Sequence, residues 1–304
     1  MRPVFHAGEL DVQSRAGVRD LAGRVARSIQ PFLPSVAQEF LRRQVLAVVA
    51  SLDSTGKVWA SALTGPPGFI EVPDSRSVKL NVSPVRADPL VGNLAVNDQV
   101  GLIAIEFASR RRILVNGRAR LDPDGHLLIL VQQAYSNCPK YIQRRIPKFQ
   151  GELPQPAETL TVVGPKKHLD DEQQSWIQRA DTFFVASYHP EAGADASHRG
   201  GNPGFVRVDG ANRLLWPDYS GNAMFQTLGN VASYPQAGLL FIDFEKDRTL
   251  QLTGTAQIIW EAQRVSGFPG AERLVEFEVG QVVEISGRGG PAWGFVDYSP
   301  FNPG

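Results

Sequence analysis

The sequence predicts a mainly β protein with short helices, built as two tandem small barrels. Three observations support this prediction: a repeat that matches the two halves of the chain, apolar β-branched runs of strand length, and short helix signals at matching places in each half. The 304 residues suit two domains at about 150 residues each, and the 42% apolar content is enough to give each domain a core.

The repeat is visible as short identical or conservative blocks. Val49-Ala50-Ser51 recurs as Val185-Ala186-Ser187 at a shift of 136 residues. Gly101-Leu102-Ile103 recurs as Gly238-Leu239-Leu240 at a shift of 137, so one residue is inserted between the blocks. Because a sequence repeat indicates a repeated structural unit, we expect the same topology in both halves.

Each half begins with a predicted short helix, since Ser35-x-x-Gln38 and Asp171-x-x-Gln174 both resemble capping boxes. A second short helix is expected later in each half. Asp88-Pro89 supplies a cap and a first-turn proline in the first half, and Ser220-Gly221-Asn222 stands at the expected helix start in the second.

Apolar runs between these helices predict strands over 45–51, 100–107 and 112–121 in the first half and 183–187, 237–244 and 250–260 in the second. Turn signals such as Asp53-Ser54-Thr55-Gly56 separate them. Many strands with two short helices per half are typical of a small barrel.

Two segments lie outside the repeats. Val18, Leu21, Ala22, Val25 and Ile29 share one helical face, which predicts an amphipathic N-terminal helix packed on the body. Prolines and glycines concentrate between residues 147 and 167. The expected organisation is an N-terminal helical extension (1–34), a first repeat (35–146), a linker (147–170) and a second repeat that holds the ligand site (171–304).

Composition favours a small-molecule partner. Lysine plus arginine equals aspartate plus glutamate at 31 each, so no basic excess attracts nucleic acid or an anionic membrane. No signal-peptide core and no apolar run of roughly 20 residues is present, and we therefore expect a cytoplasmic protein. Cys138 is the single cysteine and the histidines lack ligand spacing, so no metal site is expected. Hydrolase, Walker and Rossmann motifs are missing.

The two halves differ most in their polar residues. A ligand bound to one half explains this difference better than packing, because packing makes the same demands on both copies. Ala62-Leu63-Thr64 is replaced by His198-Arg199-Gly200, and Leu80 to Ser83 is replaced by Trp216-Pro217-Asp218-Tyr219, which continues into Ser220-Gly221-Asn222. Phosphate prefers free N–H groups at a helix N-terminus with arginine and hydroxyl donors nearby. Trp216 and Tyr219 suit the wall of a flat heteroaromatic ring. Taken singly, Arg199 fits a surface ion pair and Trp216 a core residue equally well; together the residues predict a site for a phosphorylated aromatic ligand.

The repeats resemble the FMN-binding split barrel of pyridoxamine 5'-phosphate oxidase and its relatives, in particular the two-barrel flavin-nucleotide-binding branch. The segments 137–145, 195–206 and 216–230 carry the resemblance, which covers almost the whole chain. It implies that Arg199, Ser220, Gly221 and Asn222 hold the FMN phosphate. The cofactor-binding residues expected on these grounds are His198, Arg199, Gly200, Trp216, Pro217, Asp218, Tyr219, Ser220, Gly221 and Asn222, together with Lys140, which follows Pro139 at an expected helix start.

The resemblance also implies an intramolecular pseudo-dimer of split barrels, monomeric or further paired as a homodimer, whose first site is degenerate. Pro203-Gly204 stands where oxidases of the family have a lysine, so vitamin B6 oxidation is not expected. The expected function is an FMN-dependent oxidoreductase that draws on NADH, NADPH or a redox partner protein. No catalytic residue is named, because the flavin performs the chemistry. The alternatives are a non-catalytic flavin-binding or storage protein and a deazaflavin- or haem-binding barrel.

Overall fold

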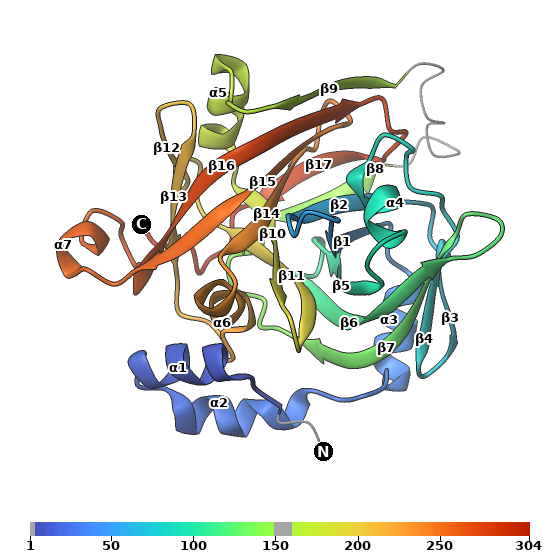
Figure 1. Ribbon diagram of the computed structural model, residues 1–304, viewed down its shortest axis with the longest axis horizontal. Coiled ribbons are helices and arrows are strands. Elements are labelled where there is room, and N and C mark those ends of the chain that lie inside the picture. The colour runs from blue at the N-terminus through green and yellow to red at the C-terminus, as the bar shows by residue number, and fades with distance from the viewer. Residues whose placement is uncertain (1–3, 149–159) are drawn as a thin grey trace.

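Two antiparallel sheets with one common strand order form the body of the chain (Figure 1). The computed structural model describes residues 4–148 and 160–304. The first sheet contains β1 (Leu46–Leu52), β2 (Val58–Thr64), β3 (Ile70–Asp74), β4 (Ser77–Leu80), β5 (Gln99–Glu106), β6 (Arg111–Leu121) and β7 (Leu127–Ser136). The second contains β10 (Thr182–His189), β11 (Gly193–Gly200), β12 (Arg207–Asp209), β13 (Arg213–Asp218), β14 (Gln236–Asp243), β15 (Arg248–Ile259) and β16 (Arg273–Ser286).

The order β2-β1-β5-β6-β7-β4-β3 in the first sheet is repeated as β11-β10-β14-β15-β16-β13-β12 in the second. The register is repeated as well, since Ala50 pairs with Gly101 and the matched Ala186 pairs with Gly238. The prediction of two halves with one β topology is therefore confirmed.

The helices of the repeats form where the sequence predicts them, with corrections at their starts. α3 (Ser35–Arg42) and α5 (Asp171–Arg179) open the halves, but the N-cap of α3 is Pro34 and makes no side-chain bond. The capping box of α5 is formed by Asp170 and Gln173, one residue before the predicted pair. Asp88 caps α4 (Pro89–Leu94) as predicted, because its carboxylate accepts from the Leu90 N–H.

The corresponding helix of the second half, α6 (Gln226–Ser233), does not begin at Ser220 to Asn222 as predicted. Ala223 and Phe225 both have φ of 62°, in the left-handed region, so right-handed helix cannot start before Gln226. Residues 220–225 instead form an irregular loop between β13 and α6.

The N-terminal segment forms two helices instead of the single one predicted. α1 (Ala7–Arg15) and α2 (Arg19–Val25), which continues into a 3₁₀ turn (Ala26–Ser28), are separated at Gly17, whose φ is +71°. α1 packs on α6, as Figure 1 shows at the lower left. The two helices meet at glycines, since a Cβ on Gly8 would lie 2.3 Å from the carbonyl oxygen of Gly229. No helix in the described ranges is long and apolar enough to span a membrane.

The remaining elements lie outside the common strand order of the two sheets, and two of them form a separate two-stranded sheet. Of the expected linker, residues 149–159 lie outside the described part, and Thr161–Lys166 form β9, which pairs with β16. β8 (Arg144–Lys148) pairs with β17 (Ala292–Asp297), and α7 (Ala262–Val265) precedes β16.

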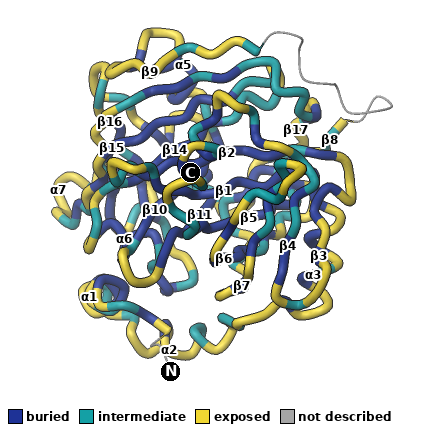
Figure 2. Tube along the Cα trace, turned by 45° about the vertical axis from the view of Figure 1, so that its right-hand side comes forward, coloured by how far each residue is buried: buried dark blue, intermediate teal, exposed yellow. Residues whose placement is uncertain are grey.

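The halves share an apolar core, which Figure 2 shows as buried strands at the centre of the molecule. Two equivalent close contacts between backbones lie at this interface. A Cβ on Gly101 in β5 would lie 2.6 Å from Cα of Asp195 in β11, and a Cβ on Gly238 in β14 would lie 2.6 Å from the Val58 carbonyl oxygen in β2. Each half therefore presents a glycine where the second strand of the other half crosses, as expected for an intramolecular pseudo-dimer.

Candidate functional site

A cleft between the halves brings together all the expected ligand residues except Trp216 and Ser220. Its empty space amounts to about 840 Å³, including the part open to solvent. The expected residues that line it are His198, Arg199 and Gly200 from β11, Pro217, Asp218, Tyr219, Gly221 and Asn222 from β13 and the loop that follows, and Lys140 from the first half.

Trp216 does not form the wall expected of it. Its side chain is 1% exposed and packs in the core of the second half, with its ring centroid 5.3 Å from that of Phe183. Tyr219 does line the cleft, beside Tyr141 of the first half at a centroid distance of 4.9 Å. Ser220 is exposed, and its carbonyl accepts from the Tyr141 hydroxyl at 3.1 Å. Two tyrosines, one from each half, thus form part of the aromatic lining of the cleft.

The N-terminus of α6 faces the cleft through Gln226, Thr227 and Leu228. The first-turn N–H groups of a helix have no partner within the helix and favour an anion. The preceding loop is held by side-chain bonds: Asn222 Nδ2 donates to Asn137 Oδ1 at 2.6 Å, and Asn222 Oδ1 accepts from the Met224 N–H at 3.0 Å. The left-handed conformations in this loop are typical of strain at ligand-binding segments.

Arg112, at the start of β6, is a cleft residue that the sequence analysis missed. Its Nη1 lies 3.1 Å from His198 Nδ1, and its Nη2 donates to the Cys138 carbonyl at 2.9 Å. Burial, with a smaller effect of the nearby Arg199 charge, lowers the pKa of Arg112 to about 10. The matched residue of the second half is Thr249, so the comparison that singled out Arg199 could have found Arg112 as well.

Four buried polar atoms of cleft residues have no hydrogen-bond partner in the described chain: Arg112 Nε, Asp195 Oδ2, His198 Nε2 and Arg199 Nε. Each buried group left unpaired costs about 1–3 kcal/mol. Burial also lowers the pKa of His198 and raises the pKa of Asp195 and of Asp218. This donor and acceptor set suits a ligand that is anionic at one end and polar along one edge.

Lys140 reaches the cleft from a turn, not from the predicted helix. Its Nζ lies 5.9 Å from the ring centroid of Phe301, near the C-terminus. A helix does not form here because the next residue, Tyr141, has φ of 66°.

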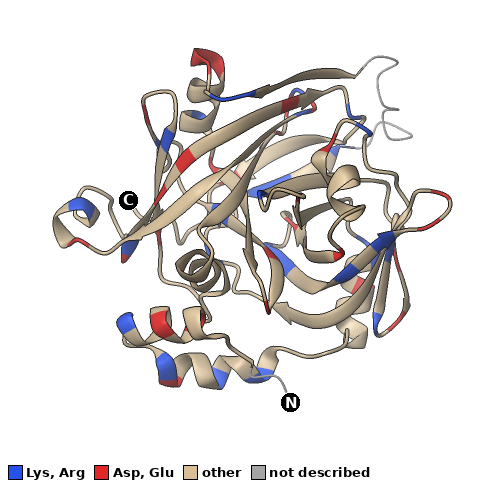
Figure 3. Cartoon of the chain, in the orientation of Figure 1, with Lys and Arg blue, Asp and Glu red and all other residues tan. Residues whose placement is uncertain are grey.

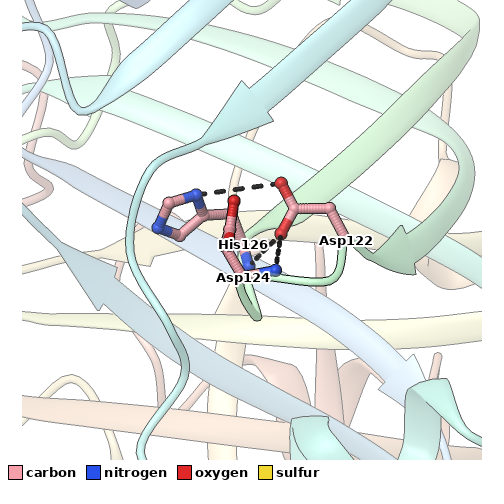
Figure 4. Close-up of side chains that lie close together, drawn as sticks. All are labelled: Asp122, Asp124 and His126. Carbon is pink, nitrogen blue, oxygen red and sulfur yellow. Dashed lines mark hydrogen bonds and ion pairs between the residues drawn. The ribbon is translucent and has the colours of Figure 1, made fainter.

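Charged residues of both signs are scattered over the described part of the molecule (Figure 3). Within that part, one group has the composition of a metal site: Asp122, Asp124 and His126 in the turn between β6 and β7 (Figure 4). The Asp122 carboxylate already accepts from the N–H groups of Asp124 and His126, both at 2.9 Å, and lies 3.0 Å from Lys79 Nζ. Turn formation and this ion pair account for the group.

Residues 169–287 match the sequence model of the family described as pyridoxamine 5'-phosphate oxidase. HupZ of Group A Streptococcus is similar at 13% identity and a TM-score of 0.32, over 41% of this chain and 98% of that protein. A putative pyridoxamine 5'-phosphate oxidase of Lactobacillus delbrueckii is 14% identical with a TM-score of 0.32, over 38% and 98%. An FAD-binding protein of Mesorhizobium loti is 8% identical with a TM-score of 0.28, over 41% and 96%. No curated protein matches the chain.

Proposed function

We propose that this chain, whose residues 169–287 match the pyridoxamine 5'-phosphate oxidase family, binds one FMN in the cleft between its halves and acts as an FMN-dependent oxidoreductase. The observation that carries the proposal is the set of unpartnered buried polar atoms on Arg112, Asp195, His198 and Arg199, gathered beside a free helix N-terminus. A ligand with a phosphate and a polar ring edge would pair these groups and remove the cost of burying them.

The residues present fit FMN at both of its ends. Arg199 and the first-turn N–H groups of α6 would hold the phosphate, and Arg112, which also lines the cleft, would add a positive charge. Tyr141 and Tyr219 would form an aromatic wall for the ring. The flavin supplies hydride and single-electron transfer when bound, and the protein orients it and limits the access of water.

A pyridoxamine-phosphate substrate is not part of this proposal. Where oxidases of the family have a lysine, this chain has Pro203-Gly204 in a tight turn, and Gly204 has φ of +90°. No cationic side chain is available at that place to hold a substrate phosphate. The electron donor is proposed to be NADH, NADPH or a redox partner protein.

The proposal is tested first by the absorbance of the purified protein and the mass of its released ligand. Release of FMN supports the proposal, whereas release of FAD, a deazaflavin or haem overturns the assignment. Anaerobic addition of NADH or NADPH then separates an oxidoreductase from a flavin carrier, because only the bound flavin of an oxidoreductase should be reduced rapidly by these donors.

Arg199→Ala tests the phosphate site. A charge-assisted hydrogen bond contributes about 1.5–3 kcal/mol, so this variant should bind FMN roughly 10-fold to 150-fold more weakly. The matched control is Leu63→Ala, because Leu63 occupies the equivalent strand position and is 2% exposed in the core of the first half. The control should lose stability and keep its FMN affinity. Unchanged FMN binding by Arg199→Ala in a fluorescence titration would refute the assignment.

A further inference from the structure

The carboxyl group of Asp195 is held in an uneven environment at the wall of the cleft. It is 3% exposed on β11. Its Oδ1 accepts from the Tyr135 hydroxyl at 2.7 Å and from Asn116 Nδ2 at 3.3 Å, while its Oδ2 has no partner in the described chain. Both protein donors therefore converge on one oxygen, and the other oxygen belongs to a residue that lines the cleft.

This arrangement favours the neutral acid over the carboxylate. An ionised Asp195 would leave a buried, partly charged Oδ2 without a donor, which is costly. In the neutral acid the proton lies on Oδ2, because Oδ1 already accepts two hydrogen bonds. Oδ2–H is then a donor that lacks an acceptor within the described protein.

The groups around Asp195 are consistent with a neutral acid. Burial raises the pKa of Asp195, although the hydrogen bonds from Tyr135 and Asn116 and, to a smaller extent, the positive charge of Arg199 oppose this. Glu9, from α1, lies near enough for each charge to disfavour the other, and burial raises the pKa of Glu9 to about 8. Tyr135, from β7, stays protonated because burial raises its pKa well above 10. On the α6 side the uncharged hydroxyl of Thr227, which bonds to Ser197 Oγ at 2.8 Å, lowers the pKa of Asp195 by a smaller amount.

The residues at the matched positions form no such group. At the repeat shift of 136, Asp195 matches Trp59. In the sheet registers, Tyr135 matches Val283 and Asn116 matches Thr253. Because packing makes the same demands on both copies, a buried polar trio at only one of the two equivalent places between the halves points to a ligand.

We propose that Asp195 donates a hydrogen bond from Oδ2 to a carbonyl oxygen or ring nitrogen on the heteroaromatic part of the ligand, with Tyr135 and Asn116 as positioning residues. This inference rests on the proposed flavin site and specifies which part of the ligand faces β11. The ligand must present an acceptor edge to the acid. Affinity must fall when Asp195 loses its proton.

Two substitutions at position 195 test the donor. Asp195→Asn keeps an acceptor for Tyr135 and a donor for the ligand, so it mimics the neutral acid. Asp195→Leu removes both. With riboflavin, which lacks the phosphate, Asp195→Asn should bind as the wild type does, and Asp195→Leu should bind about 2-fold to 12-fold more weakly, the equivalent of one net hydrogen bond.

The pH profile separates a hydrogen-bond donor from a merely structural residue. Riboflavin affinity of the wild type should fall as pH rises, whereas that of Asp195→Asn should not change. Tyr135→Phe removes a donor that stabilises the carboxylate, so it should move the midpoint of the fall to higher pH. Far-UV circular dichroism and thermal unfolding establish that each variant is folded.

The outcomes distinguish this inference from the proposed function. If the wild-type protein binds neither FMN nor riboflavin, both proposals fail. If it binds both flavins and Asp195→Leu binds them as tightly as the wild type, the inference alone is overturned. It is also overturned if Asp195→Asn binds as weakly as Asp195→Leu, because the ligand would then require the carboxylate. Arg199→Ala should weaken FMN and spare riboflavin.

Discussion

Alanine at position 101 should destabilise the chain and weaken flavin binding at the same time. Gly101 lies in β5 where the backbone of β11 crosses it. An added Cβ would lie 2.6 Å from Cα of Asp195, 2.7 Å from the Ala194 carbonyl oxygen and 2.8 Å from the Ala196 nitrogen. All three atoms belong to the backbone of a paired strand, so a side-chain rotation cannot relieve the contact and β11 must move.

The expected cost follows from overpacking a close-packed interface, which typically amounts to about 1–3 kcal/mol of unfolding free energy. Moving β11 also displaces Asp195 from the cleft wall, and Arg199 lies on the same strand. Losing one net hydrogen bond to the ligand corresponds to roughly 2-fold to 12-fold weaker flavin binding. Urea unfolding measures the first effect and flavin fluorescence titration the second.

Gly238→Ala is the matched control, because its Cβ would lie 2.6 Å from the Val58 carbonyl oxygen and 2.8 Å from Cα of Trp59 in β2. It should destabilise the protein comparably and leave flavin affinity unchanged, since β2 lies on the side of the degenerate site. Gly92→Ala, in α4 with nothing within 4 Å, should stabilise the protein by up to about 1 kcal/mol. The reasoning is refuted if Gly101→Ala is as stable as the wild type, or if Gly238→Ala weakens flavin binding equally.

Two further predictions concern buried charges. Burial raises the pKa of Glu9 from 4.5 to about 8, so the folded state holds the proton of Glu9 more tightly than the unfolded state does. The free energy of unfolding should therefore fall by about 2 kcal/mol as the pH rises from 6.5 to 8. His6 does not disturb this range, because its pKa is lowered to about 4 and affects stability only below pH 6.5. Glu9→Gln should flatten the fall in urea unfolding curves, and an equally steep fall in this variant would contradict the assignment. Arg288 donates to the carbonyl of Ala62, the residue that matches His198 of the second half. The positive charge of Arg288 also interacts with the buried Asp88. Arg288→Ala should therefore lower the melting temperature while calorimetric titration still gives one flavin per chain; a second equivalent would show that Arg288 alone blocks the other site.

The sequence was sufficient for the topology because the repeat and the strand-length runs are local signals. The recurrence of Gly101 and Gly238 was also visible, but its cause was not, since the clash that excludes a side chain involves a strand of the other half. The helix start at Ser220 to Asn222 was predicted wrongly for a local reason. Non-glycine residues rarely adopt left-handed φ, so the conformations of Ala223 and Phe225 have no sequence signal.

The sequence predicted the candidate site best where continuous segments of the second half supply it, with Lys140 as the one predicted residue from the first half. Comparing the copies identified Arg199 and the loop after β13, which lie in continuous segments. The prediction that Trp216 lines the ligand site was wrong, because its side chain is buried in the core. The sequence of the strand alone does not show which of its two faces packs on the core and which faces the cleft. Asp195 and its donor Tyr135 are 60 residues apart and come from different halves, and no periodicity relates them.

A pseudo-dimer of this kind can lose one site without harming the other, because the two clefts use different residues from each half. The cleft with the expected ligand residues takes Arg112 from β6 and Arg199 from β11. The opposite cleft, with about 380 Å³ of empty space, is lined by Thr249, which matches Arg112, and by Thr64 and Arg288. The guanidinium of Arg288 fills part of that space and bonds to Thr249 Oγ1 at 3.3 Å. The protein's own Arg288 therefore fills part of the opposite cleft, whereas the cleft around Arg112 and Arg199 keeps the larger empty space for the proposed ligand.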